Sequence, residues 1–412
     1  MIGRRGRDGD NDARVLSAAG AGLDGLNLFV ATIQTGFGPF IAVYLTTEGW
    51  TQTEIGIALS IGTITAMASQ MPGGALVDAV SRKSRVAGFS VLAFAASALV
   101  FAVRPTPLFV YLAQALHGFA SCTLGPAVVA MSLAVAGKAA LGLRLGRNAR
   151  YASIGNGVGA VVLGACGYYV SNRAVFLLTA AFTLLALTTL RPLSRIDARP
   201  SEREAPKATE RPSIAGVLAD PRLLIFAACT ALFTLANAAM LPLASTALTK
   251  QAGSIANLLI AACVVLPQLV VALSSPLVGG VAETRGRRGV LIIGFLMLPL
   301  RGLLFAVVTS PPLVVAVQAL DGIAAAAFGV MVPLVAADIA GRTGHFNFAL
   351  GFIGFAIGVG STVGTTLAGW IADRSGDPAA FVTLAAIGAG ATLLVWRAMP
   401  ETRPARDAVT IP

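Results

Sequence analysis

The chain has 412 residues, of which 56% are hydrophobic and 12% are charged, with a formal net charge of +11. Soluble domains carry roughly 25% charged residues, so this composition excludes a soluble protein whose surface has the usual share of charged residues. A basic surplus is compatible with nucleic-acid binding only where the bases form a solvated face, so their placement along the chain decides what the surplus means.

Twelve apolar segments follow one another along the chain, each close to the length of about 20 residues that a helix needs to cross a bilayer. They are Leu26–Leu45, Ile55–Val77, Val86–Val103, Leu108–Val135, Tyr151–Val170, Ala174–Leu190, Leu223–Leu243, Ile255–Val281, Val290–Val308, Leu313–Ala337, Phe348–Ala372 and Ala379–Met399. We therefore expect an all-α integral membrane protein with twelve transmembrane helices.

A charged break lies between the sixth and seventh segments. Residues 191–222 hold twelve charges and five prolines, a composition that cannot bury a core and predicts a mobile linker. The expected organisation is a disordered cytoplasmic tail (1–22), a six-helix half (23–190), a linker (191–221), a second six-helix half (222–399) and a cytoplasmic tail (400–412). The tail has no apolar signal-peptide region before the first segment.

The basic residues alternate between the two sides of the predicted membrane. If the N-terminus is inside, 25 of the 30 Lys and Arg residues fall in the tails and the even-numbered loops. Cytoplasmic loops of membrane proteins carry this excess of bases. The surplus is thus a topology signal: both termini are expected on the cytoplasmic side of the inner membrane, and nucleic-acid binding is disfavoured.

The two halves repeat each other in sequence, with a loop motif after helix 2 and a copy after helix 8. The motif is a glycine, an acid four residues on, and two bases: Gly74, Asp78, Arg82 and Lys83 in the first half, and Gly279, Glu283, Arg287 and Arg288 in the second. The offset is 205 residues. Duplicated halves of this kind are a known plan of transporters.

Three further pairs support the duplication. Gln114, His117 and Gly118 in helix 4 match Gln318, Asp321 and Gly322 in helix 10 at an offset of 204, Gln34 matches Asn237 at 203, and Asn148 matches Asn347 at 199. Pro39 and Pro242 follow Gln34 and Asn237 by five residues, so helices 1 and 7 are both expected to bend.

This arrangement resembles the major facilitator superfamily (MFS) of secondary transporters over essentially the whole chain. The resemblance implies two six-helix bundles around a central cavity, alternating access, and cavity-lining helices 1, 4, 7 and 10. It also implies that Asp78 faces the N-terminus of helix 11 and closes the cytoplasmic gate, although Ser81 stands where the family motif has Gly. The alternative is a solvated loop with ordinary membrane-flanking bases.

Among Asp, Glu, Lys, Arg and His, three residues lie in the interior of the predicted spans and not at their ends. His117 and Asp321 are each about nine residues into their helices, near the midplane, where such groups are usually functional. We expect a proton-linked pair of these two, accompanied by Gln114 and Gln318 on the same helix faces, or else a structural hydrogen bond. Arg301 in helix 9 either attracts an anionic substrate or pairs with Asp321 or Asp338 for structure.

Gln34 and Asn237 are candidate substrate contacts, with interhelical hydrogen bonding as the alternative. Asp24 is expected to cap helix 1, or to act in a gate. Glycines concentrate in helices 5 and 11, which favours close helix packing.

The function expected from these features is proton-coupled transport of a small organic solute by a monomer. The alternatives are a multidrug or metabolite efflux antiporter of the same superfamily and a non-transporting membrane sensor. Gln114 and the Gly164–Ala165 pair depart from the drug:proton antiporter pattern, which has Arg and Gly-Pro there, while residues 400–403 resemble a sugar-porter signature common at such ends.

An enzyme is not expected, because the chain has no nucleotide loop, metal-ligand spacing or nucleophile–base motif. No cofactor or metal is therefore expected. The four cysteines, far apart in apolar stretches, are predicted to be buried free thiols.

Overall fold

The computed structural model describes residues 2–37, 39–50, 52–103, 105–197, 214–244, 256–340 and 345–403. Within these ranges the secondary structure is helical, without a strand. The first half contains α1 (Ile2–Gly36), α2 (Pro39–Thr47), α3 (Gln52–Ala79), α4 (Lys83–Val103), α5 (Pro107–Ala136), α6 (Leu141–Tyr169) and α7 (Asn172–Asp197). The second contains α8 (Ile214–Leu218), α9 (Pro221–Asn237), α11 (Ala256–Arg285), α12 (Arg287–Val307), α13 (Pro311–Ala340), α14 (Phe346–Ser375) and α15 (Asp377–Ala398).

Each of the twelve predicted segments coincides with a long helix or a broken one. Ten described helices are long and apolar enough to cross a membrane by length and composition. The other two long helices are α3 and α6, with 28 and 29 residues, and they lie in the same bundle. The fold is therefore the expected all-α membrane architecture.

The bends predicted in helices 1 and 7 are present as breaks. Helix α1 ends at Gly36 and α2 starts at Pro39, since proline accepts the first helical position but lacks the N–H of a continuing helix. Helix α9 ends at Asn237, and the chain becomes helical again at residue 240, just before Pro242. The first and seventh spans are thus each built from two helical pieces.

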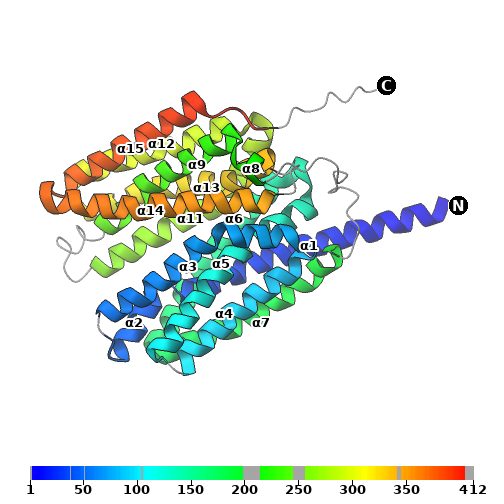
Figure 1. The fold of residues 1–412 in the computed structure, drawn as a ribbon, viewed down its shortest axis with the longest axis horizontal. Coiled ribbons are helices and arrows are strands. Elements are labelled where there is room, and N and C mark those ends of the chain that lie inside the picture. Colours follow the sequence, from blue (N-terminus) through cyan, green and yellow to red (C-terminus); the bar gives the residue numbers. More distant parts are fainter. Residues whose placement is uncertain are drawn as a thin grey trace.

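Helix α1 runs through the segment in which the sequence predicted a disordered tail. Helix α1 begins at Ile2, and its first turns project beyond the bundle as a continuous extension of the first span (Figure 1). Helix α7 likewise continues to Asp197, past the predicted end of the first half. The linker prediction itself falls largely on residues 198–213, which lie outside the described residues.

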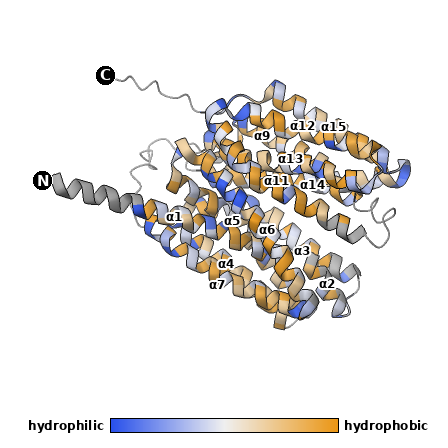
Figure 2. Ribbon diagram, turned by 180° about the vertical axis from the view of Figure 1, so that it is seen from behind, coloured by the Kyte–Doolittle hydropathy of each residue, from blue (hydrophilic) through white to orange (hydrophobic). Residues whose placement is uncertain are grey.

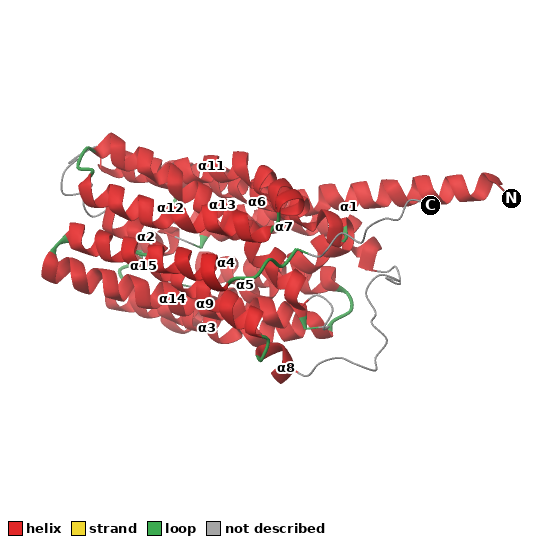
Figure 3. Cartoon of the chain, turned by 90° about the horizontal axis from the view of Figure 1, so that it is seen from above, coloured by secondary structure: helices red, strands yellow, loops and turns green. Residues whose placement is uncertain are grey.

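The helices form two bundles, α1–α7 and α8–α15, that lie side by side (Figure 1). Two helix pairs, α3 with α14 and α6 with α11, make most of the contact between them, and α6 with α13 and α5 with α14 add smaller contacts. The end of the molecule where α1 begins and where α7 and α15 finish is called the termini side below (Figures 1 and 3).

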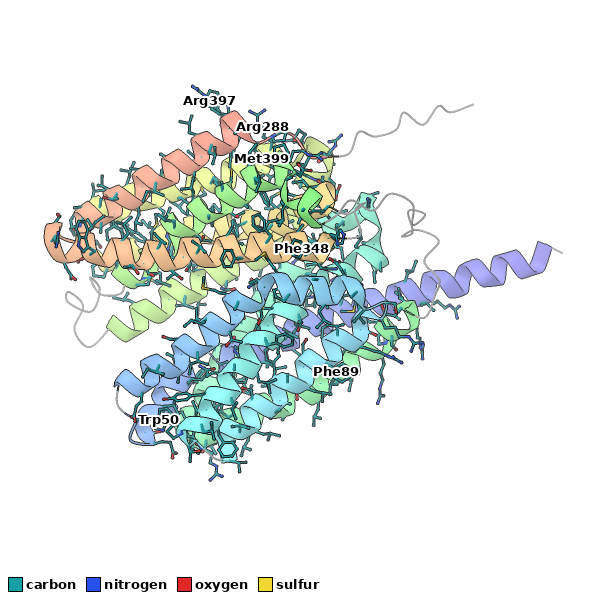
Figure 4. All side chains as sticks on the ribbon, in the orientation of Figure 1. Trp50, Phe89, Arg288, Phe348, Arg397 and Met399 are labelled. Carbon is teal, nitrogen blue, oxygen red and sulfur yellow. The ribbon has the colours of Figure 1, made fainter. Side chains whose placement is uncertain are left out.

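The outward faces of the bundles are apolar, as lipid contact requires. Figure 2 shows hydrophobic residues along the length of the helices, with hydrophilic ones gathered towards their ends. Phe89 on the outer face of α4 is 72% exposed (Figure 4). Trp396 and Trp370 are also half exposed, and Arg397 and Arg374 respectively lie over their rings.

Close glycine contacts explain how each half packs. A Cβ atom added at Gly155 of α6 would clash with the carbonyl oxygen of Leu28 in α1, and one at Gly360 of α14 would clash with that of Ala231 in α9. Gly159 and Gly364, one turn further on, make the equivalent approaches. The glycine-rich faces predicted in helices 5 and 11 therefore bring α6 against α1 and α14 against α9.

Candidate functional site

A buried ion pair lies in the second half, about one third of the way along α13. Arg301 of α12 donates from Nη1 to Asp321 Oδ1 at 2.5 Å and to Asn237 Oδ1 at 2.6 Å. Its guanidinium also lies over the Phe305 ring, 5.4 Å from the centroid. Three helices, α9, α12 and α13, thus converge on one cation.

The two partners of this pair differ in exposure. The Arg301 side chain is 1% exposed, whereas that of Asp321 is 20% exposed. Arg301 Nε and both amide atoms of Gln318, one turn before Asp321, are buried without a nitrogen or oxygen partner in the described part of the chain, and the Cys263 thiol lies beside the Gln318 amide. Unpaired buried polar groups are costly, so helix packing alone does not explain the polar side chains of this cluster.

His117 does not lie in this cluster. Its ring stacks on Phe37 with centroids 4.3 Å apart and contacts Phe94 at 5.2 Å, within the first half. The predicted His117–Asp321 pair is therefore replaced by two separate environments: an aromatic one for His117 and the Arg301 ion pair for Asp321. The helix repeat aligned the two residues, but equivalent positions in the two halves need not touch.

The remaining candidates from the sequence lie apart. Gln34 is exposed, and its backbone oxygen accepts a hydrogen bond from the Phe37 nitrogen at the break in the first span. Gln114 is 3% exposed and packs beside Gly62. Of the uncharged candidates, Asn237 and Gln318 therefore belong to the ion-pair cluster, while Gln34 and Gln114 belong to the first half.

Asp78 lies at the junction of the two halves on the termini side. Its carboxylate accepts hydrogen bonds from the Asn347 backbone and side chain, at 3.1 and 2.7 Å, and from the Phe348 nitrogen at 2.9 Å. These are the first residues of α14, where unpaired N–H groups and the helix dipole favour an anion. The predicted contact with the start of helix 11 is present, and Figure 4 places Phe348 between the bundles.

Glu283 makes the matching contact from the other half. Its Oε1 accepts a hydrogen bond from the Gly142 nitrogen, at 2.7 Å, at the start of α6. Its Oε2 pairs with Arg287 at 3.2 Å, and Arg287 also bonds Asp338 at 2.9 Å. Asp338 is thus the partner of Arg287, not of Arg301.

Glycines let the backbones meet at both contacts. A Cβ at Gly74 would clash with the carbonyl of Asn347, and one at Gly279 with the carbonyl of Gly142. The approaches of Gly146 to Ser275 and of Gly351 to Gln70 are likewise reciprocal. The packing shows that residues 142 and 347, and likewise residues 146 and 351, occupy equivalent positions in the two halves. Their offset is 205, which corrects the offset of 199 inferred from Asn148 and Asn347.

The motif bases serve the helix ends. Lys83 Nζ donates to the carbonyls of Val77 and Val80 at 2.5 and 2.8 Å, at the C-terminal end of α3. Arg288 donates to the Trp396 carbonyl, and Arg82 is exposed. The bases of the motif thus stabilise turns within each half, whereas its acids connect the halves.

Asp24 is not an N-cap. It lies inside α1, because that helix starts further upstream, and its carboxylate pairs with Arg144 and Arg147 of α6. Arg144 Nε also donates to Asn148 Oδ1 at 2.9 Å, and Asn148 bonds Ser132 at 2.7 Å. The signal available in the sequence was an acid and two bases flanking the first and fifth spans on the same side.

Two further acids were missed. Asp197 at the end of α7 accepts from the Ser84 nitrogen at 2.7 Å, and Glu401 after α15 accepts from the Arg287 nitrogen at 2.8 Å. Each caps the start of the third span of its own half. The sequence predicted Glu401 only as part of a possible family signature, because its capped helix is more than a hundred residues away.

A cavity of about 230 Å³ lies between the halves. Its walls come from four helices: Gln70 of α3, Ser121, Cys122, Gly125, Pro126 and Val129 of α5, Val332 and Pro333 of α13, and Leu350 and Gly354 of α14. Along α13 it is about 16 Å from Asp321 towards the termini side, from the helical rise. Of the four cysteines, all free, Cys122 lines this cavity, and Cys166 is only partly buried.

The described hydrogen bonds between the halves lie on the termini side or near the middle of the helices. They join Asp78 to α14, Glu283 to α6, Arg150 Nε to the Ala272 carbonyl, and Thr362 to Met67. None among the described residues joins the opposite ends. The molecule is therefore closed between its halves on the termini side. The described residues hold no cluster of three or more potential metal ligands.

This geometry, two six-helix bundles meeting at reciprocal acid–helix contacts with a polar cluster inside one of them, defines a multi-pass membrane transporter fold. The family model of the Major Facilitator Superfamily matches residues 24–249 and 226–410. The chain therefore belongs to the Major Facilitator Superfamily, as the sequence motifs predicted.

Two relatives from Mycobacterium tuberculosis are each 35% identical over 387 residues, covering 92% of this chain and 93% of theirs. They are "Uncharacterized MFS-type transporter MT2531" of strain CDC 1551 / Oshkosh and "Uncharacterized MFS-type transporter Rv2456c" of strain ATCC 25618 / H37Rv. Both relatives are described as transporters, and neither name states a substrate.

The fold is similar to two crystal structures of the fucose:proton symporter FucP, one of them a point variant of the E. coli protein and the other in the outward conformation. The TM-scores are 0.72 and 0.71, with 13% and 14% identity, covering 92% of this chain and 97% of each of those chains. At this identity the likeness shows the fold.

Proposed function

We propose that this protein is a proton-coupled secondary transporter that moves a small organic solute across the cytoplasmic membrane by alternating access. The observation that carries the proposal is the isolated Arg301–Asp321 pair: ionisable groups inside a membrane protein are costly and mark ion or substrate pathways. Both termini are assigned to the cytoplasm from the distribution of Lys and Arg. The described conformation is then the outward-facing one.

Asp78 and Glu283 act as a reversible lock in this scheme. Each binds the start of a helix in the opposite half, so the bonds exist only while the cytoplasmic side is closed. When the halves rock apart, these bonds open and the cavity behind them gains access to the cytoplasm. A solute and a proton shift the equilibrium by binding the two states with different affinity.

Asp321 is the proposed proton carrier. It is the more exposed member of the ion pair, and it is the member that can take up a proton, because the Arg301 guanidinium is already protonated. Protonation weakens its attraction to Arg301 and changes the contacts that hold α12, α13 and α9 together. The protein works as a monomer in this proposal, since the cavity and both locks are built by one chain.

The experiment is solute counterflow in proteoliposomes across a panel of neutral, cationic and anionic solutes, with and without an imposed pH gradient. We expect at least one solute to be carried and to accumulate with the gradient. Absence of flux for every solute under every gradient contradicts the transport proposal, and carriage that ignores the gradient contradicts the coupling.

A further inference from the structure

We infer that the transported solute is a small monocarboxylate whose carboxylate takes the place of Asp321 on Arg301. The inference rests on the proposed function, and it names the chemical class that the cluster of Arg301, Asp321, Asn237 and Gln318 would bind.

Arg301 needs an anionic partner in every conformational state of the transport cycle. Its side chain is 1% exposed, and an unpaired guanidinium buried among apolar helices is strongly unfavourable. Asp321 supplies the charge in the described conformation. If Asp321 takes up a proton, the cluster keeps one positive charge, and a solute anion is the group that neutralises it.

The guanidinium has donors available for such a ligand. Asp321 and Asn237 both bond to Nη1, while Nε donates to no described acceptor. The planar array of guanidinium donors matches the two oxygens of a carboxylate, which a lysine ammonium does not. This favours a carboxylate over a neutral solute.

Gln318 adds a second set of hydrogen-bonding groups. It is fully buried, its Nε2 and Oε1 bond to no nitrogen or oxygen atom of the described residues, and the Cys263 thiol lies beside its amide. It precedes Asp321 by three residues, so both side chains lie on one face of α13. A carboxylate on Arg301 would accept from the Gln318 amide, and a hydroxyl or carbonyl next to the carboxylate would satisfy the remaining groups.

Charge balance sets the stoichiometry. Two ionised carboxylates beside one Arg301 would leave a net negative charge in the membrane, so anion binding requires protonated Asp321. The nearby ionisable groups are Arg301 on α12 and Cys263 on α11, which lies close enough to interact with the Arg301 charge, while α9 supplies the neutral Asn237. Arg144, Arg147 and Arg150 lie in the first three turns of α6, and the charged residues of α14 and α15 lie in the end turns of those helices. One proton therefore accompanies one monocarboxylate.

The test is binding and exchange of lactate, pyruvate, butyrate and benzoate by the full chain, in detergent and in proteoliposomes. Lactamide and the methyl esters serve as neutral controls. We expect at least one acid to bind and exchange, with an affinity that falls by up to about tenfold per pH unit as Asp321 loses its proton, and at least about tenfold weaker binding of its neutral analogue.

Variants separate the roles of the pair. Asp321→Asn is expected to bind and exchange the acid with an affinity independent of pH, but to lose accumulation driven by a pH gradient. Arg301→Lys is expected to lose at least about tenfold in affinity. If single changes impair folding, the double variant with Arg301→Gln and Asp321→Asn keeps the site neutral and is expected to fold without binding acids. Arg374→Gln, whose arginine lies over Trp370 in the last turn of α14, is the control and is expected to bind normally.

Carriage of neutral or cationic solutes with the pH gradient, without binding of any acid, overturns the carboxylate inference and leaves the proposed function standing. Equal affinity for an acid and its amide also overturns it. Absence of carriage for every solute counts against both.

Discussion

Asp78 and Glu283 occupy equivalent positions in the two halves, and each accepts hydrogen bonds from the start of a helix in the opposite half. The Phe348 nitrogen lies 2.9 Å from Asp78, and the Gly142 nitrogen lies 2.7 Å from Glu283. The interface is therefore reciprocal: the acid of one half meets the fifth helix of the other half on both sides. A single approximate twofold relation accounts for both contacts.

Replacing Asp78 by Asn is expected to favour opening on the termini side. Hydrogen bonds to a charged group contribute about 1.5–3 kcal/mol each, so losing the charge shifts the equilibrium by about tenfold to a hundredfold. The native Cys122 thiol reports the change, because it lines the cavity behind the contact. Maleimide labelling of Cys122 is expected to become faster and transport to be lost, while the protein still reaches the membrane.

Asp220→Asn is the matched control, because Asp220 caps α9 within one half. Unchanged labelling and normal transport by Asp78→Asn would contradict its role in closing the halves.

Adding one methyl group at Gly146 is expected to prevent closure. A Cβ there meets the Ser275 carbonyl and the Pro276 backbone, and neither can move aside as a side-chain tip would. Gly157→Ala, on the same helix, has no atom within 4 Å of the added carbon and is the control. We expect Gly146→Ala to raise Cys122 labelling and to slow transport, and Gly157→Ala to change neither. Equal behaviour of the two variants would refute the close-contact argument.

His117 is expected to act through its ring. It stacks on Phe37 at 4.3 Å, so His117→Phe keeps the aromatic contact, whereas His117→Ala opens a cavity costing about 2–4 kcal/mol. Thermal unfolding in detergent is expected to show a lower midpoint for the alanine variant alone. Proton-coupled transport by His117→Phe is expected to persist. If His117→Phe folds but loses proton-coupled transport, the result would support His117 as a proton carrier.

Glu401 is expected to give a pH-dependent stabilisation of the second half. Burial alone would raise its pKa, but backbone N–H groups of Arg287, Arg403 and Arg288 outweigh burial and hold the pKa below its usual value. A lowered pKa means that the stabilisation is complete above the usual value near 4.5 and is lost as the pH falls through the lowered pKa.

Because Glu401 is exposed, its contribution is small, about 1 kcal/mol after solvent screening. Glu401→Gln is expected to lower the unfolding midpoint at pH 7 and to converge with the unchanged protein in acid. A constant difference between the two proteins down to acid pH would argue against this mechanism.

The sequence predicted the twelve spans and the duplication, because these depend on composition and spacing, and the resemblance of a local motif to that of the family implied the Asp78 contact. It left the partner of Asp321 open between His117 and Arg301, since that choice depends on how helices rotate against one another. Arg301 precedes Asp321 by 20 residues, yet only the packing of α12 on α13 turns both side chains together.

The errors at the helix ends have a similar origin. Asp24 was predicted as a cap because the apolar segment begins just after it, but membrane-spanning helices continue as polar helix beyond the apolar core. The repeat between helices 5 and 11 was matched on Asn148 and Asn347, which look alike but face different partners. Packing of glycine on backbone carbonyls gives the correct register at residues 146 and 351.

Simultaneous recording of proton and solute flux in proteoliposomes tests the central claim most directly. For any carried solute, the account predicts proton movement with the solute in the unchanged protein, and solute exchange without proton movement in Asp321→Asn. Proton-coupled accumulation that persists in Asp321→Asn would contradict it.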